Sequence, residues 1–69
     1  AQAATYLDAL ESGITLLSEH AEIGRPADHI KVGYRAFTKE HHVIYYQISE
    51  QHIDVIGILH ERMDPLAYI

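Results

Sequence analysis

The sequence predicts an α+β fold in which one N-terminal helix packs on a three-stranded antiparallel meander. An apolar stripe at helical spacing opens the chain, and three segments rich in β-branched and aromatic residues follow it. Short polar connections separate these segments, which is typical of antiparallel hairpins. A chain of 69 residues makes one domain at most, so we expect a single domain over residues 1–69.

The predicted helix carries apolar residues at every third or fourth position, which places them on one face. These residues are Leu7, Leu10, Ile14 and Leu17. We expect the helix to end near His20, because Gly24 and Pro26 interrupt the pattern that follows. Ala3, Tyr6 and Gly13 are expected on the opposite helix surface, where a missing helix or a helix of a partner protein would pack.

Three strands are predicted after a loop over residues 21–29, in which we expect Ile23 to pack against the helix end. They run from Lys31 to Phe37, from His42 to Ile48 and from Ile53 to Leu59. After the last strand, Asp64 and Pro65 form a typical cap and first position of a short helical turn.

Both faces of the predicted sheet are apolar. On the second strand Val43 and Tyr45 point one way, and Ile44, Tyr46 and Ile48 point the other. On the third strand Ile53, Val55 and Leu59 oppose Ile56 and Ile58. A sheet with one solvated face would alternate apolar and polar residues. One helix covers one face, so we expect a missing segment, another copy or a partner to cover the second.

Charge and composition restrict the possible functions. The net charge is −5, with five Lys and Arg against ten Asp and Glu, which argues against nonspecific binding to nucleic acid. No apolar run approaches the roughly 18 residues of a membrane helix, so no membrane association is expected. Cysteine is absent, which excludes disulfides and fits a cytoplasmic protein.

No cofactor motif is present, and a metal site is not expected. His41 and His42 are adjacent at a strand start, so their side chains face opposite ways and are poorly placed to share one metal ion. The spacing typical of zinc ligands on a helix is absent as well.

Four successive segments resemble signatures of the ParE toxins of the RelE/ParE superfamily. They are residues 23–26 (Ile-Gly-Arg-Pro), 33–37, 42–46 and 58–64. The resemblance runs from the helix to the C-terminal residues and implies a fold of strand, helical hairpin and antiparallel meander. This chain supplies the second helix and the meander, so we expect it to be truncated at its N-terminus.

The resemblance implies a non-enzymatic toxin of a type II toxin-antitoxin system that inhibits DNA gyrase and is neutralised by a ParD-like antitoxin, with which it forms a hetero-oligomer. Arg62, Met63 and Asp64, together with His60, lie where these toxins have their gyrase-directed residues. One alternative is a solvated chain end, and another is a tail held in place by Arg62–Asp64 and His60–Asp64 pairs.

The antitoxin is expected to lay an amphipathic helix and a strand on the apolar surfaces. The predicted contact residues are Tyr6, Arg35, Phe37, Ile44 and Tyr46. For Arg35 the alternative is an outward residue on an edge strand, where a charge discourages aggregation.

A RelE-like ribosome-dependent ribonuclease is the alternative function. Such a nuclease needs cationic groups on the strands to hold the phosphate and an acid or base beside them. The resemblance implies that nuclease members have lysines on the first strand of the meander and an arginine at the start of the second. At about these places this chain has Tyr34, Ala36 and Val43. A nuclease would therefore have to use Arg62 and Tyr68, which keep the family spacing, with His60 as the base. A member that only binds antitoxin is the third possibility.

Overall fold

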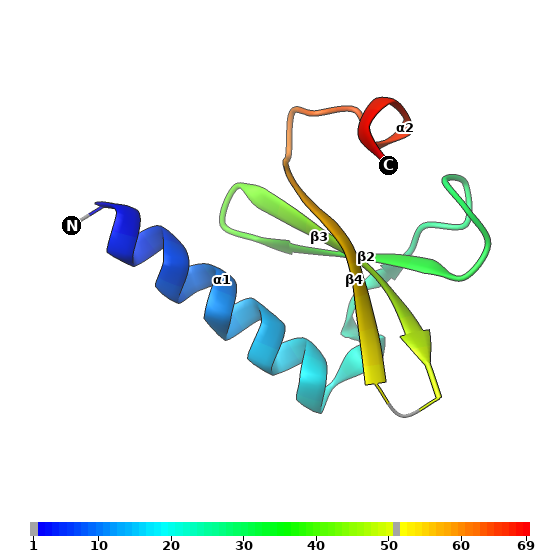
Figure 1. The fold of residues 1–69 in the computed structure, drawn as a ribbon, viewed down its shortest axis with the longest axis horizontal. Coiled ribbons are helices and arrows are strands. Elements are labelled where there is room, and N and C mark those ends of the chain that lie inside the picture. Colours follow the sequence, from blue (N-terminus) through cyan, green and yellow to red (C-terminus); the bar gives the residue numbers. More distant parts are fainter. Residues whose placement is uncertain (1, 51) are drawn as a thin grey trace.

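Figure 1 shows the fold in the computed structural model, which describes the backbone of residues 2–50 and 52–69 and the side chains of residues 11–50 and 52–69. The helical elements are α1 (Gln2–Glu19), the short 3-10 helix η1 (Ala21–Ile23) and α2 (Pro65–Tyr68). The strands are β1 (Arg25–Pro26), β2 (Tyr34–Lys39), β3 (His42–Ser49) and β4 (His52–His60). The predicted α+β class is confirmed.

The sheet has four antiparallel strands in the order β1-β2-β3-β4, one more than predicted. The additional strand, β1, pairs Arg25 with Ala36 and Pro26 with Arg35. Two residues are too few to show any periodicity, and proline disfavours a strand except at an edge. The predicted loop over residues 21–29 is therefore wrong at β1, and Ile23 is 44% exposed rather than packed against the helix.

Helix α1 packs on one face of the sheet through Ile14 and the fully buried Leu17. Gly13 lies on this side too, because a Cβ there would be 3.2 Å from Cδ1 of Ile44. Its predicted place on the opposite helix surface is wrong, since residues four apart, such as Gly13 and Leu17, share a helix face. The side chains of Ala3, Tyr6, Leu7 and Leu10 lie outside the described residues.

Two cores lie on the two faces of the sheet. On the α1 face Leu17, Ile44 and Tyr46 are fully buried, and partly buried residues surround them. Those residues are Ile14, Phe37, Ile53 and Ile58. The second core is built from Ala27, Ala36, Val43 and Tyr45, with Ile30, Tyr34, Ile56 and Leu59 packed against them.

The second face is covered by the chain itself, contrary to the prediction that another body is required. Val43 is 5% exposed and Tyr45 is 6% exposed. Ala27 and Ile30, in the connection between β1 and β2, pack over this face. The side chain of Ile69 returns to it at Gly57, where an added Cβ would lie 3.8 Å away. Irregular segments without periodicity provide this cover, so their role is invisible in the strand pattern.

A β-bulge in β4 changes the faces predicted for that strand. Tyr45 pairs with Gly57 but Tyr46 pairs with Val55, so Ile56 is an extra residue in the ladder. An extra residue reverses the alternation of side chains beyond it. Ile53 and Ile58 therefore share the α1 face, and Ile56 and Leu59 lie in the second core.

The hydroxyl of Tyr46 joins the sheet to the segment that follows α1. It donates a hydrogen bond to the carbonyl of Ala21 and accepts one from the amide of Gly24 at 3.1 Å. Arg35 strengthens the same junction, because its guanidinium donates to the carbonyl oxygens of Glu22, at 2.9 Å, and Gly24. These bonds fix the chain where it passes from the helix into β1.

Substitution of Gly24 by alanine is expected to destabilise the protein by about 1–3 kcal/mol, the usual cost of overpacking. An added Cβ would overlap the Tyr46 hydroxyl and lie 2.9 Å from Cε1 of that ring and 3.0 Å from the carbonyl oxygen of Ala36. Urea denaturation measures the loss. Gly57→Ala is the matched control, because its nearest contacts would be at an ordinary 3.8 Å. Equal stability of Gly24→Ala and the parent protein would contradict the close packing.

None of the helices in the described part of the chain is both long and apolar enough to span a membrane.

Candidate functional site

The C-terminal tail, residues 60–69, leaves the end of β4 through a tight turn. The amide of Met63 donates to the carbonyl of His60 at 2.9 Å, which closes the turn. The carboxylate of Asp64 then accepts from the amide of Leu66 at 3.0 Å, and Pro65 takes the first helical position. The predicted cap is confirmed, because both residues meet the local demands of a helix start. Figure 1 shows α2 beyond the end of β4, folded back toward the sheet.

The side chain of His60 holds the backbone of the next residues. Its Nδ1 lies 3.2 Å from the amide nitrogen of Arg62. A backbone N–H can only donate, so Nδ1 accepts and the ring hydrogen is on Nε2. His60 pairs with His42 across β3 and β4, and the two rings meet edge to face with centroids 5.4 Å apart.

The turn between β2 and β3 contacts the tail through His41. The His41 carbonyl accepts from the amide of Glu61 at 2.8 Å, and its Nδ1 lies 3.2 Å from a carboxylate oxygen of Glu61. The His41 ring also stacks on that of His60, with centroids 6.5 Å apart. The side chains of His41 and Glu61 are 75% and 44% exposed, so this pair contributes little to stability. The contacts of His41 place the β2–β3 turn against the start of the tail.

Arg62 is exposed, and its guanidinium has no hydrogen-bond or ion-pair partner among residues 11–50 and 52–69. The predicted alternative, Arg62–Asp64 and His60–Asp64 pairs, is not formed. Asp64 caps α2 instead, and Nδ1 of His60 faces the Arg62 backbone. The site therefore presents an arginine side chain to solvent from a backbone that is held at both sides.

The structure brings His60, Arg62, Met63 and Asp64 together in one turn and the start of α2, as their closeness in sequence requires. Tyr68 is 64% exposed and, within the described part of the chain, makes no hydrogen bond to Arg62 or His60. The sequence pattern does not indicate His41 as a residue of this site, because nothing local places the β2–β3 turn beside Glu61.

The predicted antitoxin contacts are placed differently from expectation. Ile44 and Tyr46 are fully buried under α1, which removes them from the surface open to a partner. Phe37 is half-buried in the same core. Arg35 donates to backbone carbonyls, and β2 lies between β1 and β3, so the edge-strand alternative for Arg35 is wrong. Tyr6 lies outside the described side chains. Strand alternation separates two faces but does not say which one the helix covers.

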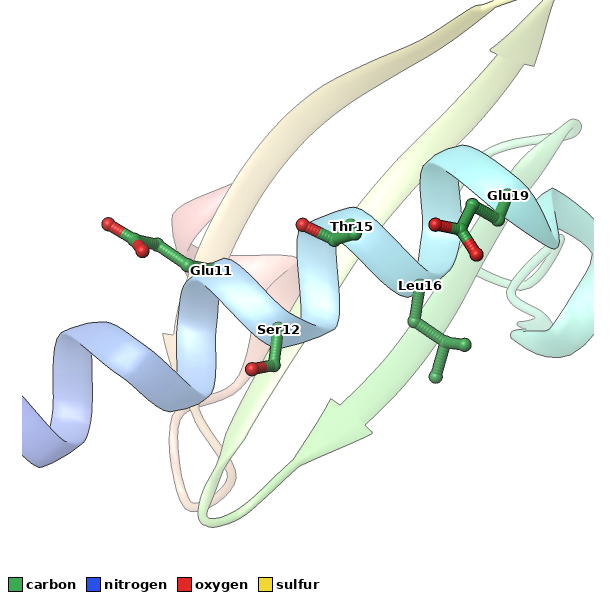
Figure 2. Close-up of a pocket in the computed structure, with 5 residues that line it drawn as sticks. All are labelled: Glu11, Ser12, Thr15, Leu16 and Glu19. Atoms are coloured by element: carbon green, nitrogen blue, oxygen red, sulfur yellow. The ribbon is translucent and has the colours of Figure 1, made fainter.

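Other apolar side chains remain open on the same side of the molecule. Figure 2 shows a hollow on the outer face of α1, away from the strands. It is lined by Glu11, Ser12, Thr15, Leu16 and Glu19. A groove between the end of α1 and the β3–β4 hairpin is lined by Ser18, Ala21, Ile48, Glu50, His52 and Ile53. Leu16 and Ile48 are each 38% exposed, and Val55 is 43% exposed. Leu16, Ile48 and Val55 therefore replace Ile44 and Tyr46 as candidates for a partner surface.

The described residues contain no group of three or more histidine, aspartate or glutamate side chains arranged to hold a metal ion. The His60 ring contacts the rings of both His41 and His42. His41 also contacts Glu61, and Nδ1 of His60 accepts from the Arg62 backbone.

The helix, the antiparallel meander and the tail beyond its last strand define a RelE/ParE-like fold. Residues 1–65 match the family described as the ParE toxin of the type II toxin-antitoxin system parDE. Toxin ParE1 of Caulobacter vibrioides is 31% identical over 68 residues, which cover 99% of this chain and 70% of that protein. Toxin ParE1 of Mycobacterium tuberculosis (strain H37Rv) is 39% identical over 64 residues, 91% of this chain and 65% of the relative.

The chain therefore belongs to the ParE toxin family of type II toxin-antitoxin systems, within the RelE/ParE superfamily. It spans about two thirds of the length of these relatives.

Proposed function

We propose that this toxin inhibits DNA gyrase by binding it through His60, Arg62, Met63 and Asp64, and that a ParD-like antitoxin neutralises it. The observation that carries the proposal is the exposed Arg62 guanidinium, which has no partner in the described part of the chain. Arginine is enriched among the residues that dominate binding energy at protein interfaces. A tail that is already folded also loses less conformational freedom when it binds.

Action by binding rather than by catalysis is supported by the strand positions where a nuclease needs cations. Ala36 is 2% exposed and Val43 is 5% exposed, so both are core residues that a phosphate cannot reach. Tyr34, at the third position, is half-buried against the same core. The net charge of −5 further disfavours RNA binding.

Substitution of Arg62 by alanine is expected to raise the concentration needed for half-inhibition of gyrase supercoiling at least tenfold, equivalent to about 1.4 kcal/mol. The loss arises because the guanidinium contributes to binding while making no contact within the described fold. A supercoiling assay with purified gyrase and the protein that contains these 69 residues measures it.

Arg25→Ala is the control, since it removes the same charge from an exposed arginine in β1, where the guanidinium donates to Thr38. It should inhibit like the parent protein. Equal losses in both variants would point to charge alone, and absence of inhibition by the parent protein would refute the proposed target. Cleavage of messenger RNA on induction, abolished by Tyr68→Ala, would instead establish the ribonuclease alternative.

For the antitoxin, the proposed contact surface consists of the exposed apolar residues of the α1 side. They are Leu16, Ile48 and Val55. An amphipathic antitoxin helix would bury these side chains, in the helix-in-groove mode of peptide recognition.

A further inference from the structure

The backbone of residues 60–63 is held by the side chain that begins the turn as well as by the turn itself. Nδ1 of His60 accepts from the amide of Arg62, and the His60 carbonyl accepts from the amide of Met63. The amide that His60 Nδ1 accepts from and the exposed guanidinium both belong to Arg62. One imidazole nitrogen is therefore the acceptor for the backbone amide of the residue whose guanidinium is exposed.

That imidazole is itself oriented by neighbours on β3 and on the β2–β3 turn. The edge of one ring in the His42–His60 pair meets the face of the other, and the His41 ring stacks on His60 at an interplanar angle of 20°. His41 also binds Glu61, the residue between His60 and Arg62, by its carbonyl oxygen and its ring. Two elements distant in sequence from the tail thus restrict the rotamer of His60.

We infer that His60 is a positioning residue for Arg62, and that His41 supports it, so that the tail is set for its protein partner before binding. This inference rests on the proposed function, because it assigns the role of His60 in the same site. Within the proposed gyrase-binding site, His60 contributes by accepting a hydrogen bond from the Arg62 amide. Fixing the backbone in advance reduces the conformational entropy lost on binding.

The chemistry of the contact allows a matched pair of substitutions. In His60→Asn the amide oxygen is bonded to Cγ, as Nδ1 is, so it can accept from the Arg62 amide. In His60→Gln the polar group lies one bond further out, so the acceptor is displaced from this position. Both variants carry an amide side chain, and they differ in the position from which the amide oxygen can accept a hydrogen bond.

The first measurement is half-inhibition of gyrase supercoiling by the protein that contains these residues. His60→Gln is expected to inhibit at least about tenfold more weakly than the parent protein, whereas His60→Asn should stay within about threefold. His52→Gln, at the other end of β4, is the control, because its ring pairs with Asp54 rather than with the tail. It should behave like the parent protein.

The second measurement is hydrogen exchange of the Arg62 amide, which needs no gyrase. Exchange should accelerate in His60→Gln and remain slow in His60→Asn, since loss of the acceptor exposes this amide to solvent. A merely structural role for His60 would change exchange throughout the sheet instead of at this amide.

The possible outcomes separate the two proposals. Unchanged exchange and inhibition in His60→Gln would overturn the positioning role. Failure of the parent protein to inhibit gyrase would refute the proposed target, while exchange at Arg62 would still decide whether His60 holds the tail. If His60→Gln does not fold, His60→Asn must still retain slow exchange and inhibition, and their loss would overturn the inference.

Discussion

Substitution of Leu17 by alanine is expected to lower the free energy of unfolding by about 2–5 kcal/mol, the range for removal of a buried leucine side chain. Leu17 is fully buried in the same core as Ile44 and Tyr46, so truncation leaves a cavity in close-packed surroundings. A folded domain is stable by only about 5–15 kcal/mol, and small domains are at the low end. Leu17→Ala should therefore leave much of the protein unfolded at 37 °C.

Urea denaturation followed by circular dichroism measures this loss. Leu16→Ala is the matched control, because Leu16 is the neighbouring leucine of the same helix but is 38% exposed on its outer face (Figure 2). Its truncation should cost less than about 1 kcal/mol. A similar cost for both substitutions would mean that α1 does not pack on the sheet through Leu17.

Substitution of Tyr46 by phenylalanine is expected to destabilise the protein by about 1–3 kcal/mol for each backbone group left without a partner. The lost hydroxyl serves two such groups, the carbonyl of Ala21 and the amide of Gly24. Phenylalanine fills nearly the same space, so cavity formation contributes little. The effect isolates the hydrogen bonds that join the end of α1 to the sheet.

Tyr45→Phe is the control for this substitution. The two tyrosines are adjacent in β3 and face opposite sides of the sheet, and both are buried. The Tyr45 hydroxyl makes no hydrogen bond among the described residues, so its removal should be nearly neutral. Thermal denaturation of the two variants compares them directly, and equal melting temperatures would contradict the role of the Tyr46 hydroxyl.

The contacts that join the end of α1 to the sheet explain the first of the segments that resemble ParE toxins, residues 23–26. Gly24 is required because the Tyr46 ring leaves no space for a side chain, and its amide binds the ring's hydroxyl. Arg35 belongs to the second segment and binds the carbonyl of Gly24. These residues hold the fold together, whereas the fourth segment contains the exposed tail.

Features with local physical causes were predictable from the residues alone. The end of α1, the β2–β3 and β3–β4 hairpins and the cap at Asp64 depend on residues within a few positions of one another. The burial of Leu17 follows from a helical period that a short segment is enough to display. The tail was predictable as a site for the same reason, since its residues are consecutive.

Long-range contacts settled the rest. The cover of the second face, the bulge at Ile56 and the burial of Ile44 and Tyr46 depend on which distant segments meet. A period of two residues defines two faces of a strand but does not choose between them, and one inserted residue exchanges them. The contact of His41 with Glu61 likewise exists because strand pairing brings the β2–β3 turn to the end of β4. Burial and partner choice are properties of the packed chain, because they require atoms that no local stretch contains.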